Sequence, residues 1–175
     1  MLNKEPTSVK TNPVKVTVLG VGNLLLKDEG IGVHVARALE KVSPPSDVEL
    51  EVIDGGTLPD APFACEEVDK LIVIDAVRAG GEPGAIYRFR PEDITLDDKI
   101  LTSLHQISLL ENLRLMEQFG QKPGDVVIIG IEPEDISWGL ELSAKLRERI
   151  PQIIKVALEE INLDYPDKPE KGEEK

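Results

Sequence analysis

Short apolar runs separated by helical patterns constrain the fold of this chain more than any other feature. Residues 14–19 and 71–75 are almost wholly apolar, which is typical of parallel strands covered on both faces. Residues 48–53 alternate like a half-exposed strand, and residues 125–131 predict the last strand. Residues 85–90 alternate like an edge strand and follow a short connection, so we expect this strand to run antiparallel.

Helical patterns fill most of the intervals between these strands. Apolar positions recur at helical spacing over residues 29–42 and 139–161, and Pro151 indicates a kink or a restart in the second helix. Residues 104–119 predict a further helix, and residues 57–69 have room for one short helix. This order of strands and helices predicts a three-layer α/β/α domain with a mostly parallel sheet.

The length of 175 residues suits one domain, with 41% apolar residues to form its core. We expect this domain to cover residues 14–163. Residues 1–13 are polar and end at a proline, which predicts a flexible leader. Residues 164–175 are too charged to join a core, which predicts a disordered tail.

The net charge of −13 disfavours nucleic acid and anionic membranes as partners, because both need clustered lysine and arginine. No apolar run approaches the roughly 20 residues of a membrane span, and the first residues lack the apolar segment of a signal peptide. We therefore expect a cytoplasmic protein. Its single cysteine excludes an internal disulfide and a cysteine-rich zinc site.

Carboxylates follow the ends of the predicted strands. The first strand leads into GVGNLLLKDEGIG, which carries Glu29 to the start of a helical pattern. Asp54 follows the second strand, Asp75 closes the third, and Glu132 follows the last. Because parallel strands share one carboxyl edge, we expect these acids to lie at the same edge of the sheet.

His105 reaches this edge from a helix. It lies between Ser103 and Gln106, which form a capping box, and so falls in the first helical turn. The helix dipole there disfavours the protonated ring, which suits a neutral metal ligand. The other histidine, His34, lies five residues after Glu29 and does not share a helix face with it.

Each candidate also has a purely structural interpretation. Asp28 and Glu29 serve equally well as an N-cap and a first-turn acid. Asp54 before two glycines is typical of a turn, and His105 of a surface or capping residue. Asp75 is harder to explain this way, because a carboxylate directly after four core residues needs a partner or a wet cleft.

Together, two acids and an imidazole at one edge predict an open site for a divalent metal. These ligands suit zinc, nickel, manganese or iron, and the ligand set alone does not choose among them. A dinucleotide site is a rival interpretation, but its fingerprint needs a third glycine after Gly20 and Gly22, and Leu25 stands in that place. We expect the two glycines to bend the chain off the first strand instead.

Five motifs occur in order along the chain: LGVGNLLLKDEGIGV, VIDGGT, IVIDAV, SLHQISL and VVIIGIEPE, the last followed by GLELS. Together they resemble the hydrogenase maturation endopeptidases, the proteases that finish the large subunit of nickel-iron hydrogenases. The resemblance covers residues 14–161. It implies an α/β fold of the phosphorylase/hydrolase-like kind, with a twisted, mostly parallel sheet of five strands between helices and one antiparallel strand.

The resemblance also implies a reaction and its residues. The reaction is a single cut, of the aspartic-type endopeptidase class, that removes the C-terminal extension of the large-subunit precursor after nickel insertion. Glu29 in KDEGIG, Asp75 in IVIDA and His105 in SLHQ match the family's catalytic residues, which contact the nickel carried by the precursor. Asp54 matches a turn that helps to shape the cleft. Other divalent ions are expected to substitute for nickel.

Two alternatives stay open at this level. Either nickel polarises the scissile carbonyl, or Asp75 or Glu29 activates water. The alternative function is that of a non-catalytic, nickel-dependent chaperone, which holds the precursor without cutting it. In both cases we expect a monomer whose partner, the large-subunit precursor, binds transiently.

Overall fold

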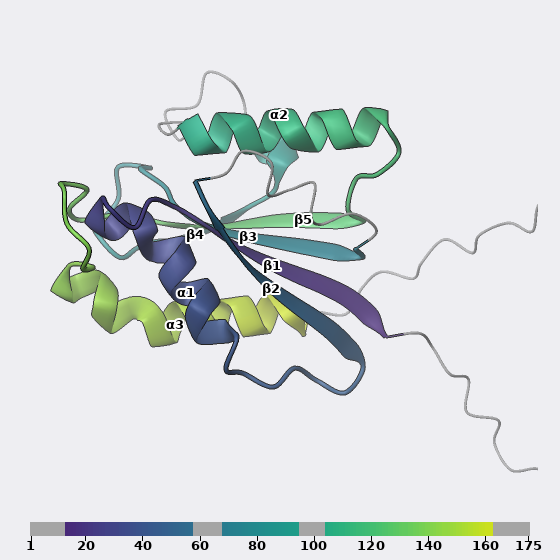
Figure 1. The fold of residues 1–175 in the computed structure, drawn as a ribbon, viewed down its shortest axis with the longest axis horizontal. Coiled ribbons are helices and arrows are strands. Elements are labelled where there is room, and N and C mark those ends of the chain that lie inside the picture. Colours follow the sequence, from purple (N-terminus) through teal and green to yellow (C-terminus); the bar gives the residue numbers. More distant parts are fainter. Residues whose placement is uncertain (1–12, 58–67, 95–103, 163–175) are drawn as a thin grey trace, which may run out of the picture.

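The structure is a computed structural model that describes residues 13–57, 68–94 and 104–162, with side chains from residue 109 onward in the last segment (Figure 1). The predicted leader, the charged tail and the capping residue Ser103 lie outside the described residues. The short helix expected at residues 57–69 lies almost wholly outside them. These predictions therefore stay predictions.

Five strands form one twisted sheet. They are β1 (Val14–Val21), β2 (Val48–Gly56), β3 (Lys70–Ala76), β4 (Ile86–Phe89) and β5 (Asp125–Ile131), in the spatial order β2-β1-β3-β5-β4. β1, β2, β3 and β5 run parallel, and β4 pairs with β5 in the antiparallel direction at one edge of the sheet. The expected mostly parallel sheet with one antiparallel strand is confirmed.

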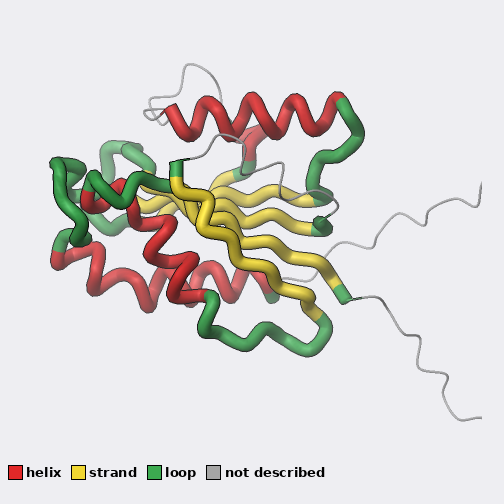
Figure 2. Tube along the Cα trace, viewed as in Figure 1, coloured by secondary structure: helices red, strands yellow, loops and turns green. Residues whose placement is uncertain are grey.

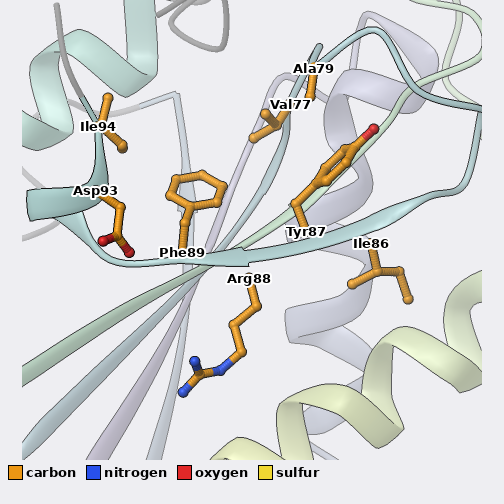
Figure 3. A pocket seen from close by; sticks show the side chains of 8 residues that line it. All are labelled: Val77, Ala79, Ile86, Tyr87, Arg88, Phe89, Asp93 and Ile94. Atoms are coloured by element: carbon orange, nitrogen blue, oxygen red, sulfur yellow. The ribbon is translucent and has the colours of Figure 1, made fainter.

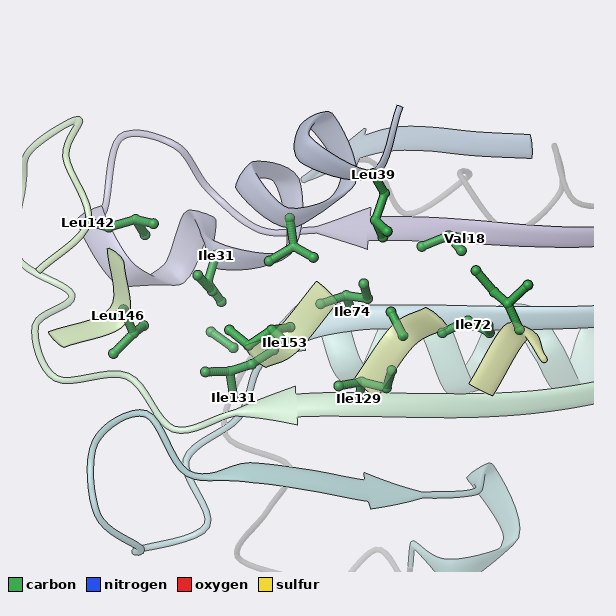
Figure 4. Close-up of a cluster of buried hydrophobic side chains, with 14 of the residues drawn as sticks. Val18, Ile31, Leu39, Ile72, Ile74, Ile129, Ile131, Leu142, Leu146 and Ile153 are labelled. Atoms are coloured by element: carbon green, nitrogen blue, oxygen red, sulfur yellow. The ribbon is translucent and has the colours of Figure 1, made fainter. Parts of the chain in front are cut away.

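Helices cover both faces of the sheet, which confirms the three-layer architecture (Figures 1 and 2). The helices α1 (Ile31–Leu39) and α3 (Ala144–Ile161) lie on one face, and α2 (Leu104–Gln118) lies on the other. Each face has its own apolar core. Under α1 and α3 the core includes Val18, Ile31, Leu39, Ile72, Ile74, Ile129, Ile131, Leu146 and Ile153 (Figure 4). Under α2 it includes Leu19, Leu71, Val73, Leu109, Leu113, Met116 and Ile128.

The central strand β3 shows how alternation places side chains in these two cores. Ile72 and Ile74 belong to the core under α1 and α3, whereas Leu71 and Val73 belong to the core under α2. Because successive side chains of a strand point to opposite faces, Asp75 follows Leu71 and Val73 toward the α2 face.

Close packing of α1 on the sheet depends on two glycines. A Cβ atom on Gly32 would lie 2.1 Å from the carbonyl oxygen of Ile74, and one on Gly20 would lie 2.3 Å from the carbonyl oxygen of Gly32. Both distances are too short for any side chain. The expectation that both glycines bend the chain off the first strand needs correction for Gly20, which lies inside β1, beside a shift in the register with β2, and whose lack of a side chain admits the helix. Gly22 is the first residue after β1 and has a φ of 148°.

The helices differ from the prediction at their ends, and α1 stops at Leu39, three residues before the expected end at residue 42. α1 begins two residues later than expected, because Lys27–Gly30 forms a separate 3₁₀ turn, η1. α3 begins at Ala144, where the Ser143 hydroxyl accepts a hydrogen bond from the Leu146 N–H, 3.3 Å away. The chain continues as one helix through Pro151. Within the described segments, no helix combines the length and apolar character that crossing a membrane requires.

Candidate functional site

The turn that carries Glu29 packs directly against the ends of β1 and β3. A Cβ atom on Gly22 would lie 2.0 Å from the carbonyl oxygen of Glu29, so the two backbones are in contact. Residues of η1 also contact β3. The register pairs Gly20 of β1 with Ile74 of β3, the residue before Asp75. The fold thus brings Glu29 and Asp75 to neighbouring strand ends.

Asp75 is held at the end of the most buried strand. Every residue of β3 is buried, and Asp75 itself is 2% exposed. Its Oδ1 accepts a hydrogen bond from the Ala76 N–H at 2.8 Å. This contact fixes the carboxylate beside its own backbone, on the face of the sheet that α2 covers.

His105 is the second residue of α2. The far end of this helix leads through a short connection to the start of β5, so its first turn lies over the opposite, carboxyl edge of the sheet (Figure 1). Thus η1, β3 and the start of α2 meet at one edge. The side chain of His105 lies outside the described part, so its contact with the two acids stays a prediction.

The donor set fits a divalent cation, because two carboxylates and one imidazole leave coordination positions open. Among the side chains that the structure describes, no group of three or more histidine, cysteine or acidic residues is positioned to hold a metal ion. The imidazole of His105 is not one of those side chains. The inference of a site with three residues therefore rests, for His105, on the position of its backbone alone.

Asp28, the neighbour of Glu29, has a structural role other than the N-cap role that its position in the sequence indicates. It is fully buried, and the N-cap of α1 is Gly30, so the interpretation of Asp28 as that cap is wrong. Its carboxylate accepts hydrogen bonds from the backbone N–H groups of Glu134, Asp135 and Ser143, at 3.0, 2.9 and 2.7 Å. Asp28 therefore holds the loop between β5 and α3 against the turn.

Lys27, the residue before Asp28, also joins the turn to the loop between β5 and α3. Its Nζ lies 2.5 Å from the carboxylate of Asp135, and its N–H donates to the Gly139 carbonyl at 3.0 Å. The hydrogen bond from Lys27, with others from Ser137, lowers the pKa of Asp135 well below its ordinary value. Lys27 has a φ of 45°, a strained value for a side-chain-bearing residue, and these contacts maintain it.

Asp54 lies at the same edge, but its carboxylate is directed to α1. It forms an ion pair with Arg37, with 2.8 Å between Nη2 and Oδ2, and accepts the Gly56 N–H at 3.1 Å. Both contacts are structural, but the expectation that Asp54 is a turn residue is wrong, because β2 continues through Asp54 to Gly56. These contacts place its carboxylate on the face opposite to that of Asp75, and its part in the cleft stays a prediction.

Glu132, the acid expected after the last strand, is a buried carboxylate at the same edge. It accepts hydrogen bonds from the Ala79 N–H at 2.8 Å, the Gly81 N–H at 3.2 Å and the Tyr87 hydroxyl at 2.9 Å. Burial alone would raise the pKa of Glu132, but these hydrogen bonds outweigh it and lower the pKa below its ordinary value. Glu132 therefore fixes the loop that follows β3, and the only sequence signal for it was an acid directly after an apolar strand.

A cavity of about 410 Å³ lies beside this loop, between β4 and the chain that leaves β3. In Figure 3, Val77, Tyr87 and Phe89 lie on one side of the β4 ribbon, and Arg88 points to the other. Val77 is two residues after Asp75, so the cavity is close to the candidate site along the chain. Nothing in the sequence pattern indicated this cavity.

The glycines of the first turn do not favour a dinucleotide. The space beside Gly20 is filled by Gly32 and Ala36, and the space beside Gly22 by the backbone of Glu29. The N–H of Gly22 donates to the Gly56 carbonyl at 2.9 Å. These backbone contacts occupy the place where a phosphate would approach the chain.

The fold and this edge define a three-layer α/β protein with a candidate site for recognising a divalent metal. A sequence profile described as hydrogenase maturation protease matches residues 33–160. The chain belongs to the hydrogenase maturation protease family, a family of peptidases. The resemblance seen in the motifs is thereby confirmed.

Relatives and solved structures agree with this assignment. The hydrogenase expression/formation protein HupD of Rhizobium leguminosarum bv. viciae is 36% identical over 148 residues, which cover 82% of this chain and 72% of HupD. The hydrogenase 2 maturation protease of Escherichia coli K12 is 33% identical, over 85% of this chain and 88% of that protein. The structure of the hydrogenase maturating endopeptidase HybD from E. coli superposes with a TM-score of 0.72 at 30% identity, covering 85% of this chain and 94% of HybD.

Proposed function

We propose that this protein is an endopeptidase that removes the C-terminal extension of a nickel-iron hydrogenase large-subunit precursor after nickel has been inserted. Its membership of the hydrogenase maturation protease family supports the reaction. The observation that carries the proposal is the packing of the Glu29 turn against the end of β3, where Asp75 lies, at the edge where the helix bearing His105 begins.

Nickel belongs to the substrate in this proposal. Glu29, Asp75 and His105 offer two carboxylates and one imidazole to the nickel ion that the precursor carries. A precursor without nickel gives these ligands nothing to hold, so it is not recognised. The protease thereby acts only on large subunits whose metal has already been inserted, and other divalent ions at the same position substitute for nickel.

The hydrolysis itself needs a base beside the scissile peptide bond. Water adds to the carbonyl carbon while the carboxylate of Asp75 or Glu29 accepts a proton from it, and the proton then passes to the leaving amine. Burial of Asp75 and its hydrogen bond from the Ala76 N–H hold that carboxylate in one orientation. Polarisation of the carbonyl by the substrate's nickel is the alternative source of activation.

The test is the intact mass of the precursor after incubation with the protease. Nickel-loaded precursor should lose its C-terminal extension, and nickel-free precursor should keep it. His105→Ala should abolish the cut. His34→Gln is the matched control, because it changes the only other histidine of the chain, on α1, and should leave cutting unchanged.

An unchanged rate for His105→Ala would contradict the assignment of the site. A stable complex in which the precursor keeps its full mass would contradict the proteolytic function, and would favour the alternative, a nickel-dependent chaperone of the precursor.

Three further features stay predictions. The monomeric state predicts a light-scattering mass near 19.2 kDa. The cytoplasmic location is testable by cell fractionation. The aspartic-type class predicts that cutting depends on Asp75 and is insensitive to reagents that modify serine or cysteine.

A further inference from the structure

Exposed apolar side chains gather beside the Glu29 turn. Among the described side chains, the large apolar ones that are exposed are Leu25, Leu115, Phe119, Trp138 and Leu140. Leu25, Trp138 and Leu140 are 51%, 79% and 66% exposed, and we call these three residues the Trp138 patch. Leu115 and Phe119 lie at the far end of α2, toward the amino ends of the parallel strands.

Backbone hydrogen bonds bring the two segments of the Trp138 patch together. Gly139, between Trp138 and Leu140, donates its N–H to the Leu25 carbonyl at 2.9 Å, and its carbonyl accepts the Lys27 N–H at 3.0 Å. Leu26 and Gly139 form a bridge of the kind found between parallel strands. The three apolar side chains therefore come from two segments, distant in sequence, that lie side by side.

The Trp138 patch is held in a fixed conformation although its side chains are exposed. The buried Asp28 carboxylate binds three backbone N–H groups of the loop between β5 and α3, and the Lys27–Asp135 ion pair joins this loop to the turn. A surface that is already ordered loses little conformational entropy when a partner covers it. An exposed tryptophan on such a surface is typical of a binding hot spot.

The Trp138 patch is continuous with the metal-recognising turn. Leu25 precedes Glu29 by four residues, and the Glu29 N–H donates to the Leu26 carbonyl at 3.1 Å. Figure 1 shows the loop between β5 and α3 beside the start of α1, at the carboxyl edge of the sheet. A ligand atom that reaches Glu29 therefore has the Trp138 patch at its side.

We propose that the Trp138 patch is the docking surface for the large-subunit precursor, an inference that rests on the proposed function. A nickel ion held inside a protein brings that protein's surface against the rim around Glu29, so the partner is the polypeptide that carries the metal. The matching surface on the precursor is apolar next to its metal site. The net charge of −13 disfavours an anionic membrane as the occupant.

Steady-state cleavage of nickel-loaded precursor tests this surface. Trp138→Ser and, separately, Leu140→Ser should raise KM without changing kcat, because they remove binding that is equal in the ground and transition states. For Trp138→Ser the expected rise is about tenfold to thirtyfold, the usual effect of removing a hot-spot tryptophan. Both side chains are largely exposed, so both variants should fold normally.

Phe119→Ser is the matched control. Phe119 is 69% exposed, and it lies at the opposite edge of the sheet, so its replacement should leave KM within about twofold of the wild type. A KM within twofold of the wild type for Trp138→Ser, while the wild type cuts normally, would overturn the docking surface and leave the proposed function intact. No cutting by the wild type would instead overturn the proposed function.

A second measurement reports binding without catalysis. The chain has one tryptophan, so 5-fluorotryptophan labels Trp138 alone. Its single ¹⁹F resonance should shift when intact precursor is added. A resonance that shifts with protease concentration alone, and not with precursor, would overturn the proposal in favour of contact between two copies of this chain.

Discussion

Asp28 and Glu29 are adjacent acids with separate tasks. Asp28 turns inward and binds three backbone N–H groups of the loop between β5 and α3, whereas Glu29 is partly exposed at the carboxyl edge. In the proposed mechanism Glu29 contacts the substrate's nickel, so Asp28 acts on recognition only through the position of its neighbour. We regard Asp28 as a positioning residue.

Replacing Asp28 should therefore lower both stability and activity. Asp28→Ala leaves three N–H groups without their charged acceptor, and we expect it to reduce the free energy of unfolding by about 2–4 kcal/mol. Asp28→Asn keeps one acceptor oxygen and should lose less. Urea denaturation measures the effect, with the exposed Asp47→Ala as a control that should change stability by less than about 0.5 kcal/mol. A loss below 1 kcal/mol for Asp28→Ala would contradict the structural part assigned to this carboxylate.

The sequence indicated which acidic residues lie at this edge, but it did not indicate the different role of each carboxylate. Asp28 and Glu29 occupy equivalent places in the pattern, and the three partners of Asp28 lie more than 100 residues farther along the chain. Asp54 and Asp75 both lie near the carboxyl ends of their strands, yet the Asp54 carboxylate is directed to α1 and Asp75 to the α2 face. Only the packed fold distinguishes the members of each pair.

The contact between α1 and the sheet sets the position of the Glu29 turn. A methyl group on Gly32 would overlap the carbonyl oxygens of Ile74 and Val21, which belong to strand backbones and have no room to move. Gly32→Ala should therefore destabilise the protein by about 2–4 kcal/mol, although alanine favours helices. Thermal unfolding measures this, and a variant as stable as the wild type would mean that α1 sits farther from the sheet.

The end of α3 is joined to two strands by a buried charge network at the edge opposite to the site. Glu160 accepts hydrogen bonds from Lys70 of β3 and from Arg88 Nε of β4, the latter at 2.5 Å. The Lys70 ammonium and the Glu160 carboxylate are both 3% exposed. Burial alone would raise the pKa of Glu160, but Arg88 and Lys70 outweigh it and lower the pKa below its ordinary value of 4.5.

This lowered pKa makes stability depend on pH with a defined sign. A carboxylate with a lower pKa in the folded state stabilises the fold above its unfolded pKa, and this contribution is lost as the pH falls through the folded pKa. At pH 7, Glu160→Gln should cost about 3–5 kcal/mol, because it removes the nearer of the two carboxylates that pair with the buried Lys70, and the other, Asp125, is 3.7 Å away. The difference between wild type and variant should shrink as the pH falls below 4.5.

Denaturant unfolding from pH 7 to pH 3 measures that difference, and Glu159→Gln is the matched control. Glu159 is exposed and pairs with Lys155 on the helix surface, at 3.7 Å, so its loss should change stability by less than about 0.5 kcal/mol. A difference for Glu160→Gln that stays constant with pH would contradict the role of its ionised form.

Elements were predictable where burial controls the pattern. β3 and β5 are apolar because both faces are covered, and the prediction of residues 125–131 agrees with the strand itself. The start of α3 was misplaced because Leu142 is buried at helical spacing although it precedes the helix. A loop residue that is buried by tertiary contacts can therefore extend the apolar periodicity of the helix that follows it.

The whole molecule places the Glu160 charge network and the candidate site at opposite edges of one sheet. The Glu160 network joins the amino edge, and Glu29, Asp75 and the start of α2 lie at the carboxyl edge. The general fold was accessible from the apolar and helical patterns, and the family from five short motifs, four at strand ends and one at the start of α2. The Trp138 patch was not accessible from the sequence, since its residues come together through contacts between segments distant in sequence, among them the bridge between Leu26 and Gly139.

In the proposed mechanism, Glu29, Asp75 and His105 act together on one substrate-borne metal. Residues of one site lose their effects together, so single and triple variants should be about equally inactive. The direct measurement is kcat/KM on nickel-loaded precursor for Glu29→Gln, Asp75→Asn, His105→Ala and the triple variant. We expect each single change to lower kcat/KM by about 10³-fold or more. The kcat/KM of the triple variant should be about equal to that of the least active single variant. A single variant that cuts at the wild-type rate, or losses that multiply in the triple variant, would contradict a shared site.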